Sequence, residues 1–439
     1  MRVVVVGGGL SGLFTASALI ARGVEDLVVV DRAGEAGGVA NTIERDGFCL
    51  EPAVGTLTLP HPDLSPILER SGVGLLRAEP SAASRYVYDG GRLIVVPSGP
   101  AALGTPLIPL HSRLRVVTEP LIRRERHSGD ESLADFCRRR FGRNAGGLLA
   151  WLAASGVYAG DPDRLAVADA FPILTQLEEQ AGSVIRGVLK RRRARPPGFE
   201  RPSAFLPVGG MSEVARSIVG QLGERYRTGF EVGRVTREGP GWVVEGPETL
   251  SADHVVMACH PEQTALLLGG ELSSVLLQTV AAPVTVVGLG GGSGPYPLPE
   301  GFGALIGSKS GLVSLGILFE SSYAPHRAPT GSWLVKVIAG GACNPEIVAW
   351  DDEVLAERVS AEVSSVIGTD LSPEFVEVVR HHPGIPQYNV GHGAWLRSVD
   401  DHLAELPGLH VTGWGYRGVG VSHIASDAVA TARRVSETV

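Results

Sequence analysis

Cysteine is scarce in this chain, which has four cysteines among its 439 residues. Cys49, Cys137, Cys259 and Cys343 are widely separated, and no Cys-x-x-Cys pair occurs. A disulfide framework needs paired cysteines, and a structural metal centre needs clustered ligands. The sequence therefore argues against both and predicts reduced thiols, no metal site and a reducing compartment.

Long hydrophobic runs are also missing. A membrane-spanning helix needs about 18 to 20 consecutive apolar residues, and no stretch reaches that length. The apolar N-terminus has features of a secretion signal, but the glycine pattern inside it favours a folded strand and helix. We therefore expect a cytoplasmic protein. With 44% hydrophobic and 20% charged residues, the composition is that of a globular chain of two or three domains.

Positive charge is in deficit overall, since the formal net charge is −8, but one segment departs from this balance. Residues 81–201 contain 19 Lys and Arg against 12 Asp and Glu. Such a local excess indicates either a solvated basic face or a segment that meets an anionic partner, either a membrane surface or a carboxylated substrate. Nucleic acid is disfavoured because no known binding module or aromatic interleaving accompanies these charges.

The strongest motif lies in the first twelve residues. Val3–Val6 is a β-branched run typical of a buried parallel strand, and it leads into Gly7-x-Gly9-x-x-Gly12 and a helix over residues 13–22. The three glycines would allow a tight turn, the approach of a pyrophosphate and close packing of helix on strand. The helix N-terminus offers unpaired N–H groups to the phosphates. This pattern predicts a Rossmann-type dinucleotide site.

A second strand over residues 27–30 supports this interpretation because it ends in Asp31. A carboxylate at this place is expected to accept hydrogen bonds from a ribose. Gly37 and Gly38 offer another close backbone approach to a phosphate or flavin edge, with a plain turn as the alternative.

The middle of the chain alternates between two kinds of pattern. Residues 85–97 read as a hairpin around an Asp-Gly-Gly turn, and Arg85 at its start is either a carboxylate clamp or a surface arginine. Residues 103–195 are helical in period, interrupted by an expected loop at 155–162. The basic run at 190–197 is expected to be an exposed loop.

The last part of the chain first becomes rich in β runs and then mirrors the opening. The runs between residues 283 and 338 predict a second, mainly antiparallel sheet. Residues 409–421 read as a strand and a glycine loop, followed by a helix to residue 435. We therefore expect both ends to meet at one cofactor. The predicted cofactor-binding residues are Gly7, Gly9, Leu10, Ser11, Gly12, Asp31, Arg32, Gly37, Gly38, Val232, Gly413, Val419, Gly420 and Val421.

Several longer motifs carry a family resemblance. They are Ser-Gly-Val-Tyr-Ala-Gly-Asp at 155–161, Phe-Leu-Pro-Val-Gly-Gly-Met at 205–211, Gly-Phe-Gly at 301–303, Gly-Ile-Pro-Gln-Tyr-Asn-Val-Gly-His at 384–392 and Tyr-Arg-Gly-Val-Gly at 416–420. Together with the glycine loop, they resemble the FAD-dependent protoporphyrinogen and coproporphyrinogen oxidases of the flavin amine oxidase superfamily. The resemblance covers essentially the whole chain.

The resemblance implies an α/β fold: a Rossmann-type FAD-binding domain, a substrate domain with a mainly antiparallel sheet, and a helical region that faces a membrane. The FAD-binding domain would comprise residues 1–80, 205–265 and 405–439. The helical substrate and membrane-facing region would be 81–204, and the substrate-domain sheet 266–404. The expected localisation is cytoplasmic, with peripheral contact at the inner face of the membrane.

The implied activity is the oxygen-dependent oxidation of protoporphyrinogen IX or coproporphyrinogen III to the porphyrin in heme biosynthesis. The hypothesis is hydride transfer from a ring-bridging carbon to flavin N5, so that no side chain is predicted as catalytic. Arg85 matches the family's propionate-binding arginine, and Tyr158, Ala159 and Gly160 would line the substrate pocket. The partners would be the tetrapyrrole and oxygen.

Two departures from the family pattern lie close to the expected flavin. Glu35 stands where relatives usually carry an arginine, and Glu51-Pro-Ala-Val-Gly-Thr56 stands where they read Glu-x-Gly-Pro-Asn. These changes leave two alternatives open. One is a diverged flavin oxidase or desaturase acting on an amine, polyene or other apolar substrate, and the other is a prenyl-binding escort without working flavin.

Overall fold

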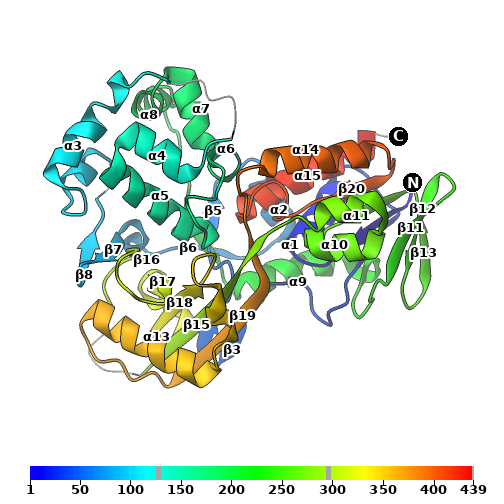
Figure 1. Cartoon of the computed structure of the whole chain (residues 1–439). Helices are drawn as coiled ribbons and strands as arrows, with labels where there is room; N and C mark the ends of the chain where they lie inside the picture. The colour runs from blue at the N-terminus through cyan, green and yellow to red at the C-terminus, as the bar shows by residue number, and fades with distance from the viewer. Residues whose placement is uncertain (98, 125–129, 293–297, 438–439) are drawn as a thin grey trace.

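The computed structural model describes residues 1–97, 99–124, 130–292 and 298–437. Figure 1 shows a sheet with its helices near both termini at the right, a group of helices at the upper left and a second sheet at the lower left. No helix in these ranges is both long and apolar enough to cross a membrane.

The sheet near the termini is parallel and has five strands in the order β10-β2-β1-β14-β20. Its central strand is β1, Val3–Val6, and the other bounds are Leu27–Val30 for β2, Tyr226–Arg227 for β10, His254–Met257 for β14 and Leu409–Val411 for β20. Successive side chains of β1 point to opposite faces, so Val3 and Val5 enter one apolar core and Val4 and Val6 the other. This arrangement explains why the strand is an unbroken run of valine.

Each face of this sheet is covered by elements from distant parts of the chain. One face packs against α1 (Leu10–Ala21), α2 (Leu64–Ser71), α9 (Gly210–Leu222) and α15 (Val421–Glu437). The other packs against the strands β11 (Arg234–Glu238), β12 (Gly241–Glu245) and β13 (Thr249–Ala252) and the helices α10 (Pro261–Leu268), α11 (Gly270–Leu276) and α14 (His392–Ala404). The packing therefore places α11 and α14 on the nucleotide-type sheet, although their residues fall within the expected range 266–404.

The second sheet has seven strands in the order β19-β15-β18-β17-β16-β7-β8. All neighbouring strands in it are antiparallel except the pair β16 and β7, which confirms the mainly antiparallel sheet expected from the sequence. The bounds are β7 Arg85–Asp89, β8 Arg92–Val95, β15 Ala281–Gly291, β16 Gly303–Ile306, β17 Ser314–Leu318, β18 Trp333–Gly340 and β19 Phe375–Pro386. Helix α13, Asp352–Ile367, packs its apolar face against this sheet.

Smaller pieces complete the sheets. Strands β3 (Ile43–Arg45) and β4 (Phe48–Leu50) form a hairpin. Strand β9 (Ser203–Pro207) lies between β5 (Leu57–Leu59) and β6 (Leu75–Arg77). Pairing of β5 with β9 joins the segment before the helical region to the segment that follows it.

The helical region comprises α3 (Leu110–Val117), α4 (Leu133–Phe141), α5 (Arg143–Tyr158), α6 (Val167–Ala170), α7 (Pro172–Ala181) and α8 (Val184–Arg193). Two sequence expectations were wrong here. Helix α5 takes up the first half of the expected loop 155–162 and ends at Tyr158, because Ala150, Ala154 and Tyr158 extend its buried stripe at four-residue spacing. The basic run is helical up to Arg193 and is not a loop from its first residue.

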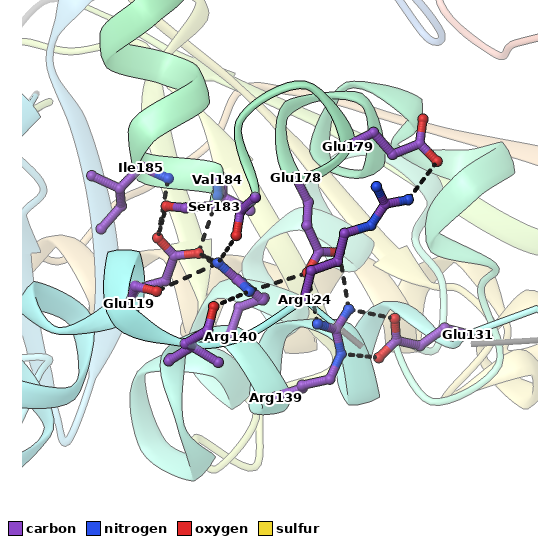
Figure 2. A network of polar contacts seen from close by, with 12 residues as sticks. Glu119, Arg124, Glu131, Arg139, Arg140, Glu178, Glu179, Ser183, Val184 and Ile185 are labelled. Carbon is purple, nitrogen blue, oxygen red and sulfur yellow. Dashed lines mark hydrogen bonds and ion pairs between the residues drawn. The ribbon is translucent and has the colours of Figure 1, made fainter. Parts of the chain in front are cut away.

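A buried ionic network holds this region together (Figure 2). Arg140 of α4 and Glu119 are both fully buried, and Arg140 Nε donates to Glu119 Oε1 at 2.6 Å. The same carboxylate accepts the backbone N–H groups of Val184 at 3.0 Å and Ile185 at 3.2 Å, so it caps the first turn of α8. Glu119 therefore ties α4 to the start of α8.

Candidate cofactor and substrate site

The glycine loop between β1 and α1 has the geometry that its spacing predicts. Gly7 has φ +114°, a conformation that residues with a side chain rarely adopt. A Cβ on Gly12 would overlap the carbonyl oxygen of Gly7 and lie 3.3 Å from the Cβ of Ala258. Both glycines are therefore required by the protein's own packing.

Gly9 is different, and it provides the test of whether a cofactor fits. A Cβ at Gly9 would have only Gly37 O nearby among the described residues, at 3.9 Å, so the packing of the chain does not demand glycine there. Gly9 is also the N-cap of α1 and has no side chain to satisfy the N–H groups of the first turn. Open space beside free N–H groups at a helix N-terminus fits a pyrophosphate.

Asp31 lies at the end of β2, next to this loop. Its carboxylate accepts the N–H of Gly8 through Oδ2 and the N–H of Ala33 through Oδ1, the latter at 2.7 Å. A carboxylate offers about four lone-pair positions, so these two bonds leave acceptors for ribose hydroxyls. Burial, with Asp31 beside it, raises the pKa of Tyr226 to about 12.

The segment after Asp31 follows the same edge of the site. Phe230 N–H donates to Asp31 O at 2.8 Å, which brings the loop containing Val232 beside Asp31. Gly37 N–H donates to Gly8 O at 2.9 Å, and the side chains of Arg32 and Glu35 are exposed. Exposure of Glu35 lets its carboxylate remain in solvent, where its repulsion of a phosphate is screened.

The C-terminal half of the site arrives with Gly413 and α15. Gly413 has φ +119°, and its would-be Cβ lies 2.9 Å from Ser11 Oγ. Asp427 of α15 holds this turn, because its Oδ2 accepts Gly413 N–H at 3.0 Å and Thr412 Oγ1 at 2.9 Å. The structure therefore brings the two glycine loops into contact. Leu10 and Val421 begin the two helices and are buried, Val419 is half-buried and Gly420 is exposed.

The segment Glu51–Thr56 is fixed by a buried group of four ionisable side chains that sequence reasoning missed. Lys336 Nζ of β18 donates to Glu51 O at 2.9 Å and Ala53 O at 3.2 Å, and it lies 3.2 Å from Glu320 Oε1. Arg327 pairs with Glu320 and lies 3.8 Å from Glu51 Oε1. The four side chains are at most 3% exposed. The side chains of Lys336 and Arg327 therefore hold the backbone of the segment Glu51–Thr56.

The charges in this group balance, which makes its burial tolerable. Burial by itself raises the pKa of Glu320, but Lys336 and Arg327 outweigh burial and lower that pKa to about 2. Burial raises the pKa of Glu51, against the pull of Arg327 and the N–H of Met211, which donates to Glu51 at 2.8 Å. A lysine in the middle of the apolar run Trp333–Ile338 was the available sequence signal for this site.

The expected substrate residues Tyr158, Ala159 and Gly160 lie together at the end of α5 and are buried. Tyr158 OH donates to Ala170 O at 3.2 Å, so the protein uses this hydroxyl and only the ring or backbone remains for a ligand. Ala159 has φ +46° and its carbonyl accepts Ala342 N–H at 2.8 Å. Their role in lining a pocket stays a prediction.

Arg85 begins β7 and is exposed. Its guanidinium carbon lies 5.0 Å from the ring centroid of Phe302, which belongs to the Gly-Phe-Gly motif. Stacking uses the face of the guanidinium and leaves its N–H groups at the edge free to grip a carboxylate. The geometry is thus compatible with the clamp that the sequence suggested.

Comparison with known proteins gives consistent results. The family model "Flavin containing amine oxidoreductase" matches residues 10–439. The chain is 27% identical to coproporphyrinogen III oxidase of Bacillus subtilis, over 96% of this chain and 94% of the relative. It is 30% identical to the chloroplastic protoporphyrinogen oxidase of Oryza sativa, over 99% and 88% respectively. A solved structure from Exiguobacterium sp. 255-15 has a TM-score of 0.84 at 24% identity and covers 100% of this chain and 99% of its own. With a glycine cradle that fits a pyrophosphate and a family match over nearly its full length, the chain belongs to the flavin-containing amine oxidoreductases.

Proposed function

We propose that this FAD-dependent oxidase converts a porphyrinogen, protoporphyrinogen IX or coproporphyrinogen III, to the corresponding porphyrin, with oxygen as the final electron acceptor. The observation that carries the proposal is the match, over nearly the whole chain, to relatives named for these two activities. The open space beside Gly9 and the contact between the two glycine loops support the proposal, because they fit the cofactor that this chemistry requires.

The residues divide the work between holding the cofactor and holding the substrate. Bound FAD supplies the acceptor for two electrons and a proton. The N–H groups of α1 hold the pyrophosphate, and Asp31 holds the ribose. Lys336 and Arg327 fix the segment Glu51–Thr56, and Arg85 binds a substrate propionate. No side chain is needed as a strong base, because pyrrole N–H protons can leave to solvent.

The test is an aerobic fluorescence assay of the purified, FAD-loaded protein with each porphyrinogen. Porphyrin emission should appear faster than in buffer alone, and anaerobic mixing should bleach the flavin absorbance. A flavin spectrum that stays unchanged with both porphyrinogens, in protein that holds FAD, would contradict the proposal. Bleaching by amines in place of porphyrinogens would then identify an amine oxidase.

Replacing Arg85 tests the substrate clamp. We expect Arg85→Ala to raise the KM for the porphyrinogen about tenfold with little change in kcat, because a charge-assisted bond to a propionate is lost. Arg85→Lys should recover part of the affinity. Arg92→Ala, which removes another exposed arginine of the same hairpin, is the control. An unchanged KM in Arg85→Ala, or an equal loss in the control, would contradict the role.

We also propose that the helical region lies on an anionic membrane surface. Leu110, Leu114, Val117 and Leu121 are 77%, 68%, 57% and 78% exposed. Their spacing of four, three and four residues places the first three on one side of α3, with Leu121 one turn beyond it, an apolar stripe that has no function in water. Figure 1 shows α3 at the outer edge of the helical region. The basic excess of residues 81–201 favours a lipid surface of negative charge.

Vesicle flotation tests this contact. The protein should float with vesicles of phosphatidylcholine and phosphatidylglycerol, and less with phosphatidylcholine alone. The double change Leu114→Asp and Leu121→Asp should lower the bound fraction several-fold, because two apolar side chains can no longer enter the interface. Leu266→Asp is the matched control, since Leu266 is 67% exposed but lies on α10 of the other region. Equal binding of all three proteins would refute the contact.

A further inference from the structure

Residues 387–393 follow β19, include the first two residues of α14, His392 and Gly393, and belong to neither sheet. We call this segment the strap. It contains most of the Gly-Ile-Pro-Gln-Tyr-Asn-Val-Gly-His motif, and its contacts with the rest of the molecule fall into two groups. One group is with the helical region, and the other is with the loop that carries Gly413 and Gly418, residues 413–420, which we call the cofactor loop.

The helical region holds the strap mainly through its backbone. Tyr388 O accepts Ala166 N–H at 2.8 Å, and Val390 N–H donates to Arg164 O at 2.8 Å. Two further N–H groups of the strap region, those of Gly391 and Gly393, donate to the carboxylates of Asp130 and Asp169, each at 3.0 Å. The strap is therefore anchored along its whole length on this side.

On its other side the strap holds the backbone of the cofactor loop with two side chains. Tyr388 OH accepts Gly418 N–H at 2.6 Å and donates to Trp414 O at 2.5 Å. His392 Nε2 lies 3.0 Å from Tyr416 O, so this nitrogen carries the proton and donates. The two rings stack with centroids 4.0 Å apart, and Tyr388 is 2% exposed.

The cofactor loop needs such support from outside. Gly413 and Gly418 have φ values of +119° and +126°. Glycine populates positive and negative φ about equally, so its own backbone preference does not fix this conformation. The strap binds the backbone of this loop at Trp414, Tyr416 and Gly418, which lie between Gly413 and the start of α15. A loop of this kind keeps one conformation only when its backbone groups are fixed by partners.

We propose that the strap positions the cofactor loop for FAD, with Tyr388 and His392 as positioning residues that act on the loop backbone and do not touch the reacting atoms. The strap also reaches the expected substrate residues, because Gln387 Nε2 donates to Tyr158 O at 2.8 Å. It thus joins the substrate side of the site to the cofactor side. The proposal rests on the FAD site and is tested without substrate, so its failure is distinguishable from failure of the porphyrinogen activity.

The experiment is a titration of the apoprotein with FAD. Quenching of FAD fluorescence reports binding and gives the Kd for FAD. Tyr388→Phe keeps the ring and removes the hydroxyl that bridges Trp414 and Gly418, and it should raise the Kd for FAD about tenfold. His392→Gln should give a smaller increase, because the glutamine amide restores a donor without the ring. Visible circular dichroism of the bound flavin should change in Tyr388→Phe.

Tyr86→Phe is the matched control, because it removes a hydroxyl that donates to a backbone carbonyl, Glu300 O at 2.9 Å, in the other sheet. Its Kd for FAD should equal that of the parent protein. A merely structural role for Tyr388 would lower the melting temperature of the apoprotein and leave the Kd and the flavin dichroism unchanged. That outcome would overturn the proposal, as would an unchanged Kd in a correctly folded His392→Gln protein if Tyr388→Phe fails to fold.

Discussion

Gly12→Ala should yield protein that carries no FAD. The added Cβ would overlap the carbonyl oxygen of Gly7 and lie 3.1 Å from the carbonyl carbon of that residue. Backbone atoms cannot rotate away as a flexible side chain can, so α1 must move off β1. This displacement removes the N–H groups of the first turn from the pyrophosphate. The measurement is the ratio of flavin to protein absorbance after purification.

Gly220→Ala controls for the loss of a glycine in a helix of the same core. Gly220 lies near the end of α9, is exposed and has no described atom within 4 Å of its would-be Cβ. Alanine there should raise the free energy of unfolding by about 0.5 to 1 kcal/mol and leave the flavin content unchanged. A normal flavin content in Gly12→Ala would show that close packing of Gly12 against Gly7 is not needed for FAD binding.

Arg140→Met should lower the free energy of unfolding by about 3 to 5 kcal/mol. The change leaves Glu119 fully buried without its counter-ion, and methionine cannot replace the bonds to the carboxylate (Figure 2). It also weakens the cap of α8, which Glu119 holds through Val184 and Ile185. Urea unfolding followed by circular dichroism measures the effect.

Two comparisons separate the cost of an uncompensated charge from the cost of lost packing. Arg138→Met removes a neighbouring arginine of α4 that pairs with Asp163, and the two side chains are 43% and 58% exposed. This change should lower the free energy of unfolding by less than about 1 kcal/mol. Adding Glu119→Gln to Arg140→Met should restore part of the stability, because the fully buried charge of Glu119 is then removed together with that of its partner. Equal costs for Arg138→Met and Arg140→Met would show that the buried pair contributes no more than a surface pair.

Local sequence predicts those parts of the site and of the fold whose residues are close together in the chain, within one turn or one strand. The valine run of β1 predicts a buried strand, the three glycines predict a phosphate-binding loop, and the β runs of the second sheet predict antiparallel strands. The sequence predicts a loop from residue 155 because of its glycines, whereas burial of Ala154 and Tyr158 against α4 and Tyr388 continues the helix as far as Tyr158. Tertiary packing decided that boundary.

The parts that sequence could not predict are those whose partners are far apart along the chain. Lys336 meets the carbonyl of Glu51 across 285 positions, and Arg327 meets that of Gly55 across 272. Tyr388 and Trp414 are only 26 positions apart, but nothing local indicates that a hydroxyl will bridge a loop. A charged residue inside an apolar run signals that a partner exists and does not say which one.

The order of strands in the parallel sheet has a consequence for how the protein is made. The central strand β1 is made long before its neighbour β14, which begins at residue 254, and before the edge strand β20, which begins at residue 409. Helix α15, which closes one face of that sheet, begins only at residue 421. Strand β1 can pair with β2 early in synthesis, but α1 lacks its packing partner α15 until almost all of these residues have been made. The cofactor site needs the glycine loops that follow β1 and β20, so it can be complete only after the loop containing Gly413 has been made.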